Sequence, residues 1–133
     1  MSAGGPAKRI VVIDDSRDSA RVLSILLKKL GYEVHVATDG ASGVKTALRV
    51  VPQIVISDVL MAGTMDGYAV ARALRAETPL AGALLVAITG RSGDDARRES
   101  LEAGFDEHLV KPIDFRKLEE LLQSYEQGGH GKR

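Results

Sequence analysis

Five polar residues stand at the points where apolar, strand-like runs of the chain stop. They are Asp14, Asp15, Asp58, Thr89 and Lys111. In an open parallel α/β sheet the carboxyl ends of the strands lie along one edge, and such folds bind their ligands there. We therefore expect three carboxylates, one hydroxyl group and one ammonium group to face the same small volume.

The three carboxylates indicate a site for a divalent cation. Like charges a few ångströms apart raise one another's pKa and cost stability unless a cation or protons neutralise them. Mg²⁺ takes one or two carboxylates together with water and a phosphate oxygen, so it is the expected ion, with Mn²⁺ as the alternative. A simpler interpretation makes Asp14 or Asp15 the N-cap of the following helix, but it explains only one of these two residues.

Asp58 is the candidate nucleophile, because a carboxylate at a strand end that faces Mg²⁺ can accept a phosphoryl group. Phosphoryl transfer depends mainly on positioning and on neutralisation of charge, and the Lys111 ammonium group is expected to supply positive charge. The Thr89 hydroxyl is expected to hydrogen-bond a phosphoryl oxygen. We expect the Lys111-Pro112 peptide to be cis, which would aim the ammonium group back over the site.

Strands and helices alternate along the chain, and this alternation predicts the fold. Apolar runs typical of strands cover Ile10–Ile13, Val34–Ala37, Ile54–Ile56, Ala83–Ile88 and Leu109–Val110. Helical periodicity follows at 22–30, 44–51, 68–74 and 118–125. The pattern predicts an α/β, flavodoxin-like (βα)5 fold. This is a three-layer sandwich around a doubly wound parallel sheet with strand order 2-1-3-4-5.

The segment before Gly104 predicts the weakest helix. Ser92, with Asp95 three residues later, is the expected N-cap, and Gly104 suits the exit. The apolar side chains that this helix offers to a core are Ala96, Leu101 and Ala103. Little apolar burial predicts an element of low stability that can shift.

The amino-acid composition gives no indication of a nucleic-acid-binding, disulfide-bonded or membrane-spanning protein. Eighteen basic and eighteen acidic residues cancel, so no excess of charge indicates a nucleic acid or an anionic membrane as the partner. The chain has no cysteine, which excludes disulfides and thiolate sites. Its apolar stretches fall far short of the roughly 20 residues that a membrane-spanning helix needs. We expect a cytoplasmic protein with one domain over residues 9–126 and flexible tails at 1–8 and 127–133.

These motifs match a known family. From about Arg9 to Tyr125 the chain resembles the receiver domain of bacterial two-component response regulators. The acidic pair after the first strand, the aspartate of the third, the threonine of the fourth and the Lys-Pro pair after the fifth occur in the family's order and approximate spacing.

The resemblance implies a role for each of these residues. Asp58 corresponds to the family's phosphoacceptor. Asp14 and Asp15, with Asp58 and the backbone carbonyl of Leu60, correspond to its Mg²⁺ site. The threonine and the lysine correspond to its switch hydroxyl and its phosphate-binding lysine.

The resemblance also implies a signalling activity. Members of the family accept a phosphoryl group from a histidine kinase, a histidine phosphotransfer protein or a small donor such as acetyl phosphate. Phosphorylation rearranges the face formed by the fourth and fifth strands and helices, which a downstream protein partner reads. We expect no enzyme beyond self-phosphorylation and self-dephosphorylation, no binding of nucleic acid or membrane, and a monomer or a weak phosphorylation-dependent dimer.

Four positions depart from the family's usual pattern. Ala62 replaces the usual proline after Met61, in a loop that is one residue longer than the commonest form. His108 occupies the aromatic switch position, where it can rotate or remain a fixed surface residue. Leu60 and Arg91 occupy positions that tune hydrolysis; Leu60 cannot orient water, whereas Arg91 is a candidate contact for the phosphoryl group.

Three other functions compete with this interpretation. A flavin mononucleotide module needs a phosphate-binding loop after the first strand, and the carboxylates here would repel that phosphate. A haloacid-dehalogenase-like phosphatase needs two aspartates separated by one residue, whereas Asp14 and Asp15 are adjacent. A receiver used only for docking, without phosphorylation, does not need the complete set of polar residues.

The sequence says less about the architecture of the whole protein and about its partner surfaces. Because only a short tail follows Glu126, we expect either a stand-alone response regulator or the receiver of a hybrid histidine kinase. The initiating Met and the loose tails favour the stand-alone protein. The expected surface for the phosphodonor is the start of the first helix, at Arg17, Asp18 and Arg21. The expected surface for downstream readout is formed by 92–102, His108 and 114–119.

Overall fold

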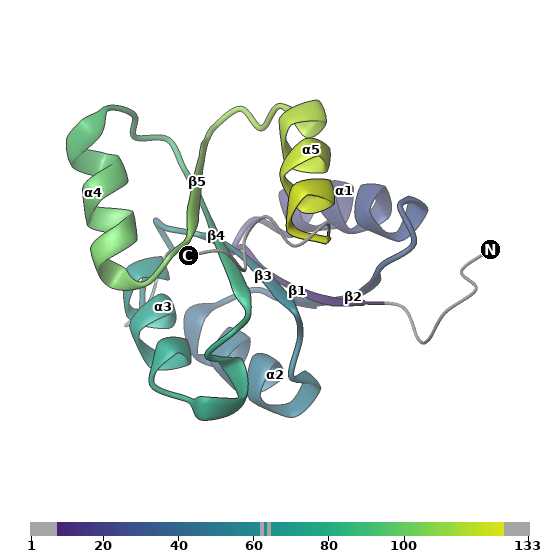
Figure 1. Cartoon of the computed structure of the whole chain (residues 1–133), viewed down its shortest axis with the longest axis horizontal. Helices are drawn as coiled ribbons and strands as arrows, with labels where there is room; N and C mark the ends of the chain where they lie inside the picture. The colour runs from purple at the N-terminus through teal and green to yellow at the C-terminus, as the bar shows by residue number, and fades with distance from the viewer. Residues whose placement is uncertain (1–7, 62, 64, 127–133) are drawn as a thin grey trace.

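The computed structural model describes residues 8–61, 63 and 65–126, which form three layers (Figure 1). The strands are β1 (Arg9–Ile13), β2 (Glu33–Ala37), β3 (Ile54–Asp58), β4 (Leu84–Thr89) and β5 (Glu107–Val110). The helices are α1 (Arg17–Lys29), α2 (Gly40–Val50), α3 (Gly67–Arg75), α4 (Asp94–Ala103) and α5 (Phe115–Glu126), with a short 3-10 helix η1 (Thr78–Leu80) before β4. Of the expected flexible tails at 1–8 and 127–133, only Lys8 is among the described residues.

The sheet has the predicted topology. Its five strands are parallel and lie in the order β2-β1-β3-β4-β5, so the flavodoxin-like (βα)5 expectation is confirmed. The strand order reverses between β1 and β3, and ligands of such folds bind outside the carboxyl ends of the strands at this point. Four observed strands extend one or two residues beyond the predicted runs, whereas β4 is shifted one residue toward the carboxyl end.

Each central strand contributes to two cores, because successive side chains point to opposite faces. In β1, Val11 and Ile13 pack under α2, α3 and α4, whereas Ile10 and Val12 pack under α1 and α5. Both faces of β1, β3 and β4 are therefore covered, which explains the nearly continuous apolar runs in their sequence. Figure 1 shows α1 and α5 on one side of the sheet and α2 and α3 on the other.

The first helix begins at neither of the aspartates that the simpler interpretation used. Its N-cap is Ser16, whose hydroxyl accepts a hydrogen bond from the backbone N–H of Ser19 at 3.3 Å. Both Asp14 and Asp15 therefore precede the cap.

Two expectations for α4 are wrong. The N-cap is Gly93, not Ser92, and no side chain caps this helix. Gly93 has φ of 100°, a conformation that favours glycine, so the chain turns into the helix one residue later than predicted. Leu101 is 48% exposed, and Ser100 is buried in its place, because the buried stripe runs through Ala96, Ser100 and Ala103.

None of the helices in the part of the chain that the structure describes has the length and apolar character that a bilayer crossing requires.

Candidate functional site

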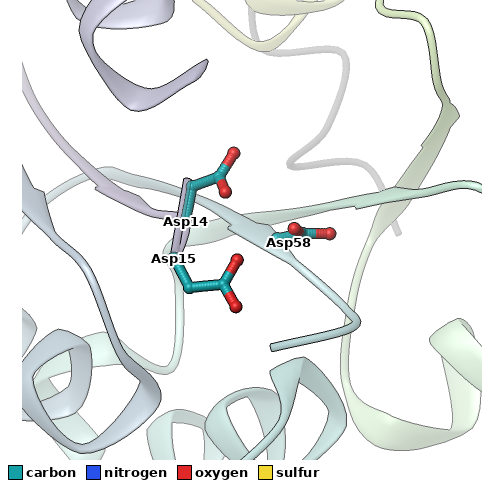
Figure 2. Close-up of side chains that lie close together, drawn as sticks. All are labelled: Asp14, Asp15 and Asp58. Atoms are coloured by element: carbon teal, nitrogen blue, oxygen red, sulfur yellow. The ribbon is translucent and has the colours of Figure 1, made fainter. Parts of the chain in front are cut away.

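Three carboxylates gather at the carboxyl ends of β1 and β3 (Figure 2). Asp14 and Asp15 follow β1, and Asp58 is the last residue of β3. One carboxylate oxygen from each lies within 4.8 Å of the others. Asp14 and Asp58 are buried, whereas Asp15 is exposed, so the cluster opens to solvent on one side.

The sheet register creates this cluster. β1 and β3 are neighbours, and Ile13 of β1 lies opposite Ser57 of β3. The next residues, Asp14 after β1 and Asp58 at the end of β3, therefore lie side by side at this edge of the sheet. Backbone hydrogen bonds hold Asp14 and the residue after Asp58: Asp14 N–H donates to Ala37 O at 3.1 Å, and Val59 N–H donates to Ile88 O at 2.9 Å.

The two oxygens of Asp58 have different surroundings. Oδ2 accepts a hydrogen bond from Lys111 Nζ at 3.0 Å. Oδ1 is buried and accepts no hydrogen bond from any described residue. Because buried polar atoms are almost always satisfied, this oxygen needs a partner that the described part of the chain does not supply. A cation fits this need, and the oxygen donors around it are those that a hard divalent cation prefers.

The cluster also affects Asp14. Burial raises the pKa of the Asp14 carboxyl above its ordinary value, and the nearby charge of Asp58 raises it further. The backbone N–H of Ser16, which donates to Asp14 Oδ1 at 2.9 Å, opposes this rise in pKa. A bound cation would favour the ionised form of Asp14 and so remove the cost of placing two carboxylates together.

The ends of β4 and β5 bring Thr89 and Lys111 to the same edge of the sheet. Thr89 is buried at the end of β4, and its Oγ1 accepts a hydrogen bond from the backbone N–H of Arg91 at 3.0 Å. The backbone N–H of Lys111 donates to Thr89 O at 2.7 Å, which ties the two strand ends together. The Lys111-Pro112 peptide is cis, as predicted.

Arg91 does not contact the acidic cluster. Its guanidinium group forms an ion pair with Glu99 of α4 at 2.5 Å and lies 3.5 Å from the hydroxyl of Tyr68 on α3. The expectation that Arg91 reaches the phosphoryl group therefore has no support in this conformation.

His108 is held at both ring nitrogens. Nδ1 lies 3.1 Å from Oγ of Ser100, and Nε2 lies 3.3 Å from the carbonyl oxygen of Arg91. A carbonyl can only accept, so Nε2 carries a proton. Ser100 was not among the predicted residues, although its spacing of four and three residues from Ala96 and Ala103 places all three on one helix face.

Gly67, the first residue of α3, is a second residue that was not among the predicted site residues. A Cβ atom on Gly67 would lie 2.3 Å from the carbonyl oxygen of Asp58, so only glycine lets α3 begin this close to the end of β3. The Leu60 side chain is 67% exposed, and the role of its carbonyl as a metal ligand stays a prediction. The prediction for Ala62 lies outside the described residues.

Comparisons with known proteins identify the family of this chain. The family model described as "Response regulator receiver domain" matches residues 10–123. The chain belongs to the response regulator receiver family. The expectation drawn from its motifs is therefore confirmed at the level of the family.

Relatives of this receiver occur among curated proteins and solved structures. Response regulator PleD of Caulobacter vibrioides is 39% identical over 106 residues, which cover 80% of this chain and 23% of PleD. Chemotaxis protein CheY4 of Vibrio cholerae is 27% identical with a TM-score of 0.82, over 88% of this chain and 97% of that chain. The receiver spans less than half the length of the curated relatives that it matches.

One similar structure contains a metal ion. The receiver domain of sensor histidine kinase PA1611 from Pseudomonas aeruginosa is 27% identical with a TM-score of 0.79, over 88% of this chain and 95% of that chain. It has a magnesium ion coordinated in its active site cleft.

A cavity of about 650 Å³ adjoins the acidic cluster of this receiver. Its walls include Asp14, Asp58 and Lys111, Val22 of α1, and Phe115 at the start of α5. The cavity thus joins the charged cluster to exposed apolar side chains on two helices of the same layer. The sequence analysis did not identify Val22 and Phe115 as neighbours of the site, because they come from opposite ends of the chain.

Proposed function

We propose that this receiver, over residues 9–126, accepts a phosphoryl group on Asp58 from a histidine kinase or a histidine phosphotransfer protein. The observation that carries the proposal is the state of the Asp58 carboxylate. It is 4% exposed, one oxygen is held by Lys111, and the other has no partner among the described residues. A carboxylate in this state can receive a cation and an electrophilic group without first breaking a network of hydrogen bonds.

Asp14, Asp15 and Asp58, with the backbone carbonyl of Leu60, would hold Mg²⁺, with Mn²⁺ as the alternative ion. When bound, the ion would offset the negative charge that the phosphoryl oxygens bring into the cluster. Its presence in the similar PA1611 receiver supports this assignment.

The transfer uses Asp58 as the nucleophile. A carboxylate oxygen forms a bond to phosphorus while the bond from phosphorus to the donor's histidine nitrogen breaks, and the imidazole leaves with the electron pair. Lys111 holds the carboxylate before transfer and remains beside the new phosphoryl group as its positive partner.

Thr89 is proposed as the residue that senses the phosphoryl group. Its Oγ1 accepts from the Arg91 N–H, so the hydroxyl proton remains available to donate to a phosphoryl oxygen. Movement of Thr89 would act on Arg91 directly and, through it, on α4 and His108.

The cavity beside Asp58 is the proposed contact surface for the phosphodonor. It opens between α1 and the turn before α5, and its apolar walls suit side chains next to the donor's histidine. Downstream readout is assigned to the surface formed by 92–102, His108 and 114–119. A cytoplasmic location and a stand-alone architecture stay predictions.

The deciding experiment is the intact mass of the protein after incubation with acetyl phosphate and Mg²⁺. We expect a gain of one phosphoryl group, lost in Asp58→Ala and lost in the presence of EDTA. Asp94→Asn is the matched control, because Asp94 is an exposed aspartate outside the cluster, and it should be phosphorylated like the wild type.

The phosphoryl group could hydrolyse too fast to be observed by mass. Binding of beryllofluoride, which mimics an aspartyl phosphate, is therefore measured as well. If the folded wild-type protein gains no mass and binds no beryllofluoride, the receiver acts as a docking module and the proposal is wrong. Sedimentation with and without beryllofluoride tests the proposed monomer or weak phosphorylation-dependent dimer.

A further inference from the structure

The α1 helix has two exposed flanks with different surroundings. Asp18 and Val22 lie on the flank that lines the cavity beside Asp58. Arg17 and Arg21 lie on the other flank, although the sequence analysis grouped them with Asp18. The reason is that successive residues of a helix are turned by about 100°, whereas residues four apart share a side.

The second flank lines a groove of about 450 Å³ between α1 and the edge strand β2. We call it the α1–β2 groove. Its walls are formed chiefly by Arg17, Arg21, Ile25 and Lys28 of α1 and Val36 of β2.

The groove is basic. Arg17, Arg21 and Lys28 are exposed, and none of them forms an ion pair with a described residue. Arg75 and Arg91, in contrast, each have a carboxylate partner within 4 Å. No aspartate or glutamate is among the described residues that line the groove. Three cations without carboxylates between them attract a negatively charged partner.

The groove is also partly apolar. Ile25 is 47% exposed and Val36 is 43% exposed, and both line the same groove. Val36 lies on the α1 side of the sheet, because Val34, two residues earlier, packs against the core beneath α1. Since β2 is an edge strand and α1 and α5 are the helices of this layer, the outer part of β2 remains uncovered. A further helix laid beside α1 would cover both apolar side chains.

We propose that the α1–β2 groove binds an acidic amphipathic helix of a partner protein. The apolar stripe of that helix would cover Ile25 and Val36, and carboxylates beside the stripe would pair with Arg17, Arg21 and Lys28. These three cations recur along one side of α1, so a parallel-running helix can meet them with carboxylates one or two turns apart. The inference goes beyond the proposed function, because this binding needs no phosphoryl group and leaves the cavity beside Asp58 free.

The test uses the complete 133-residue chain and a fluorescent synthetic helix of leucines flanked by glutamates. A length of about 20 residues exceeds the range of about 12–15 residues in which isolated helices are marginal. We expect Arg21→Glu combined with Lys28→Glu to raise the Kd, measured by fluorescence anisotropy, about tenfold. The matched control is Lys45→Glu with Arg97→Glu, which reverses two exposed charges on α2 and α4 and should change the Kd less than about twofold.

The apolar contribution is tested separately. Ile25→Ser should raise the Kd about fivefold, whereas Leu101→Ser, at an equally exposed leucine of α4, should leave it unchanged. A scrambled peptide of the same composition should bind more weakly than the amphipathic one. Circular dichroism confirms that every variant is folded, and phosphorylation from acetyl phosphate should be unaffected in Ile25→Ser.

Several outcomes would overturn the inference. These are no binding of the amphipathic helix, equal binding of the scrambled peptide, or an equal loss of affinity in the control variants. Tighter binding of a single-stranded oligonucleotide or of anionic lipid vesicles through Arg21 and Lys28 would assign the groove to a different class of ligand. The phosphorylation assay would still report on Asp58 in each case, so failure of one proposal is distinguishable from failure of the other.

Discussion

At the scale of single residues, the asymmetry of Asp58 is the most informative feature of this receiver. Lys111 satisfies one oxygen, and the other is buried without a partner among the described residues. An unsatisfied buried oxygen costs about 1–3 kcal/mol, which a folded protein retains only where another group completes the site. A bound cation would satisfy this oxygen and offset the repulsion between the neighbouring carboxylates.

Asp14 provides a test of the proposed metal site. We expect Asp14→Asn to weaken Mg²⁺ binding at least about tenfold, because it removes one of the proposed carboxylate ligands. Without Mg²⁺ the same variant should have a higher free energy of unfolding, since it removes a buried charge beside Asp58 while its side-chain oxygen can still accept from the Ser16 N–H.

Isothermal titration calorimetry measures the affinity, and urea unfolding in EDTA measures the stability. Asp94→Asn should change neither quantity. Unaltered Mg²⁺ binding in Asp14→Asn would remove this residue from the proposed metal site.

At the scale of elements, the start of α3 determines where β3 can end. The close approach of Gly67 to the Asp58 carbonyl leaves no space for a side chain. The backbone N–H of Gly67 also donates to Val59 O at 2.8 Å, which ties the start of the helix to the residue after the phosphoacceptor candidate.

We expect Gly67→Ala to lower the free energy of unfolding by about 1–3 kcal/mol, because overpacking of a tight contact forces the backbone to move. Phosphorylation from acetyl phosphate should slow as well, since the atom displaced belongs to Asp58. Gly82→Ala is the control: its Cβ would meet no atom within 4 Å, and urea unfolding should show a change below about 0.5 kcal/mol. Equal stability of the two variants would contradict the packing argument.

The α4 helix is attached to the site through Arg91. The backbone N–H of Arg91 donates to Thr89, its carbonyl accepts from His108, and its guanidinium group pairs with Glu99. One residue of the β4–α4 loop thus connects the candidate switch hydroxyl to α4 and β5.

We expect Glu99→Gln to increase amide hydrogen exchange in residues 90–98 by up to about fivefold, as loss of an exposed ion pair worth up to about 1 kcal/mol allows. Global stability should remain close to that of the wild type. Asp95→Asn breaks the other ion pair of α4, that with Arg98, without touching Arg91, and should leave exchange in the loop unaltered. Equal exchange in both variants would show that Arg91 does not restrain the loop.

At the scale of the whole molecule, a contact between distant segments closes the layer formed by α1 and α5. The hydroxyl of Tyr32, in the turn after α1, donates a hydrogen bond to the carboxylate of Glu126 at the end of α5. Burial, this hydrogen bond and the charge of Glu126 raise the pKa of Tyr32.

The raised pKa predicts how stability depends on pH. The folded protein retains the Tyr32 proton at a pH where the unfolded chain loses it. The contribution of this hydroxyl to the free energy of unfolding is therefore complete below about pH 10 and is lost as the pH rises above that value. Tyr32→Phe should lower the free energy of unfolding by about 1–2 kcal/mol near neutral pH and should show a weaker decline under alkaline conditions. Urea unfolding as a function of pH measures both effects. If the free energy of unfolding of Tyr32→Phe declines with pH as steeply as that of the wild type, groups other than Tyr32 cause the decline.

The sequence by itself determined the order and type of the elements and the identity of the candidate site residues. The spacing of apolar residues that distinguishes strands from helices depends on neighbouring residues alone. The (βα)5 pattern could therefore be predicted from the sequence. The rule that parallel strands end at one edge then placed Asp14, Asp15, Asp58, Thr89 and Lys111 together. Most of the fold was therefore predictable, with errors at strand ends and at the N-terminus of α4.

Only the tertiary structure decided which atoms meet. Lys111 lies 53 residues from Asp58 in the sequence, and no local pattern states which of the two carboxylate oxygens it contacts. Whether Ser100 or Leu101 faces the core, and which flank of α1 lines the cavity beside Asp58, depend on how each helix is rotated against the sheet. That rotation follows from packing against distant residues, which local periodicity constrains only to within a face of the helix.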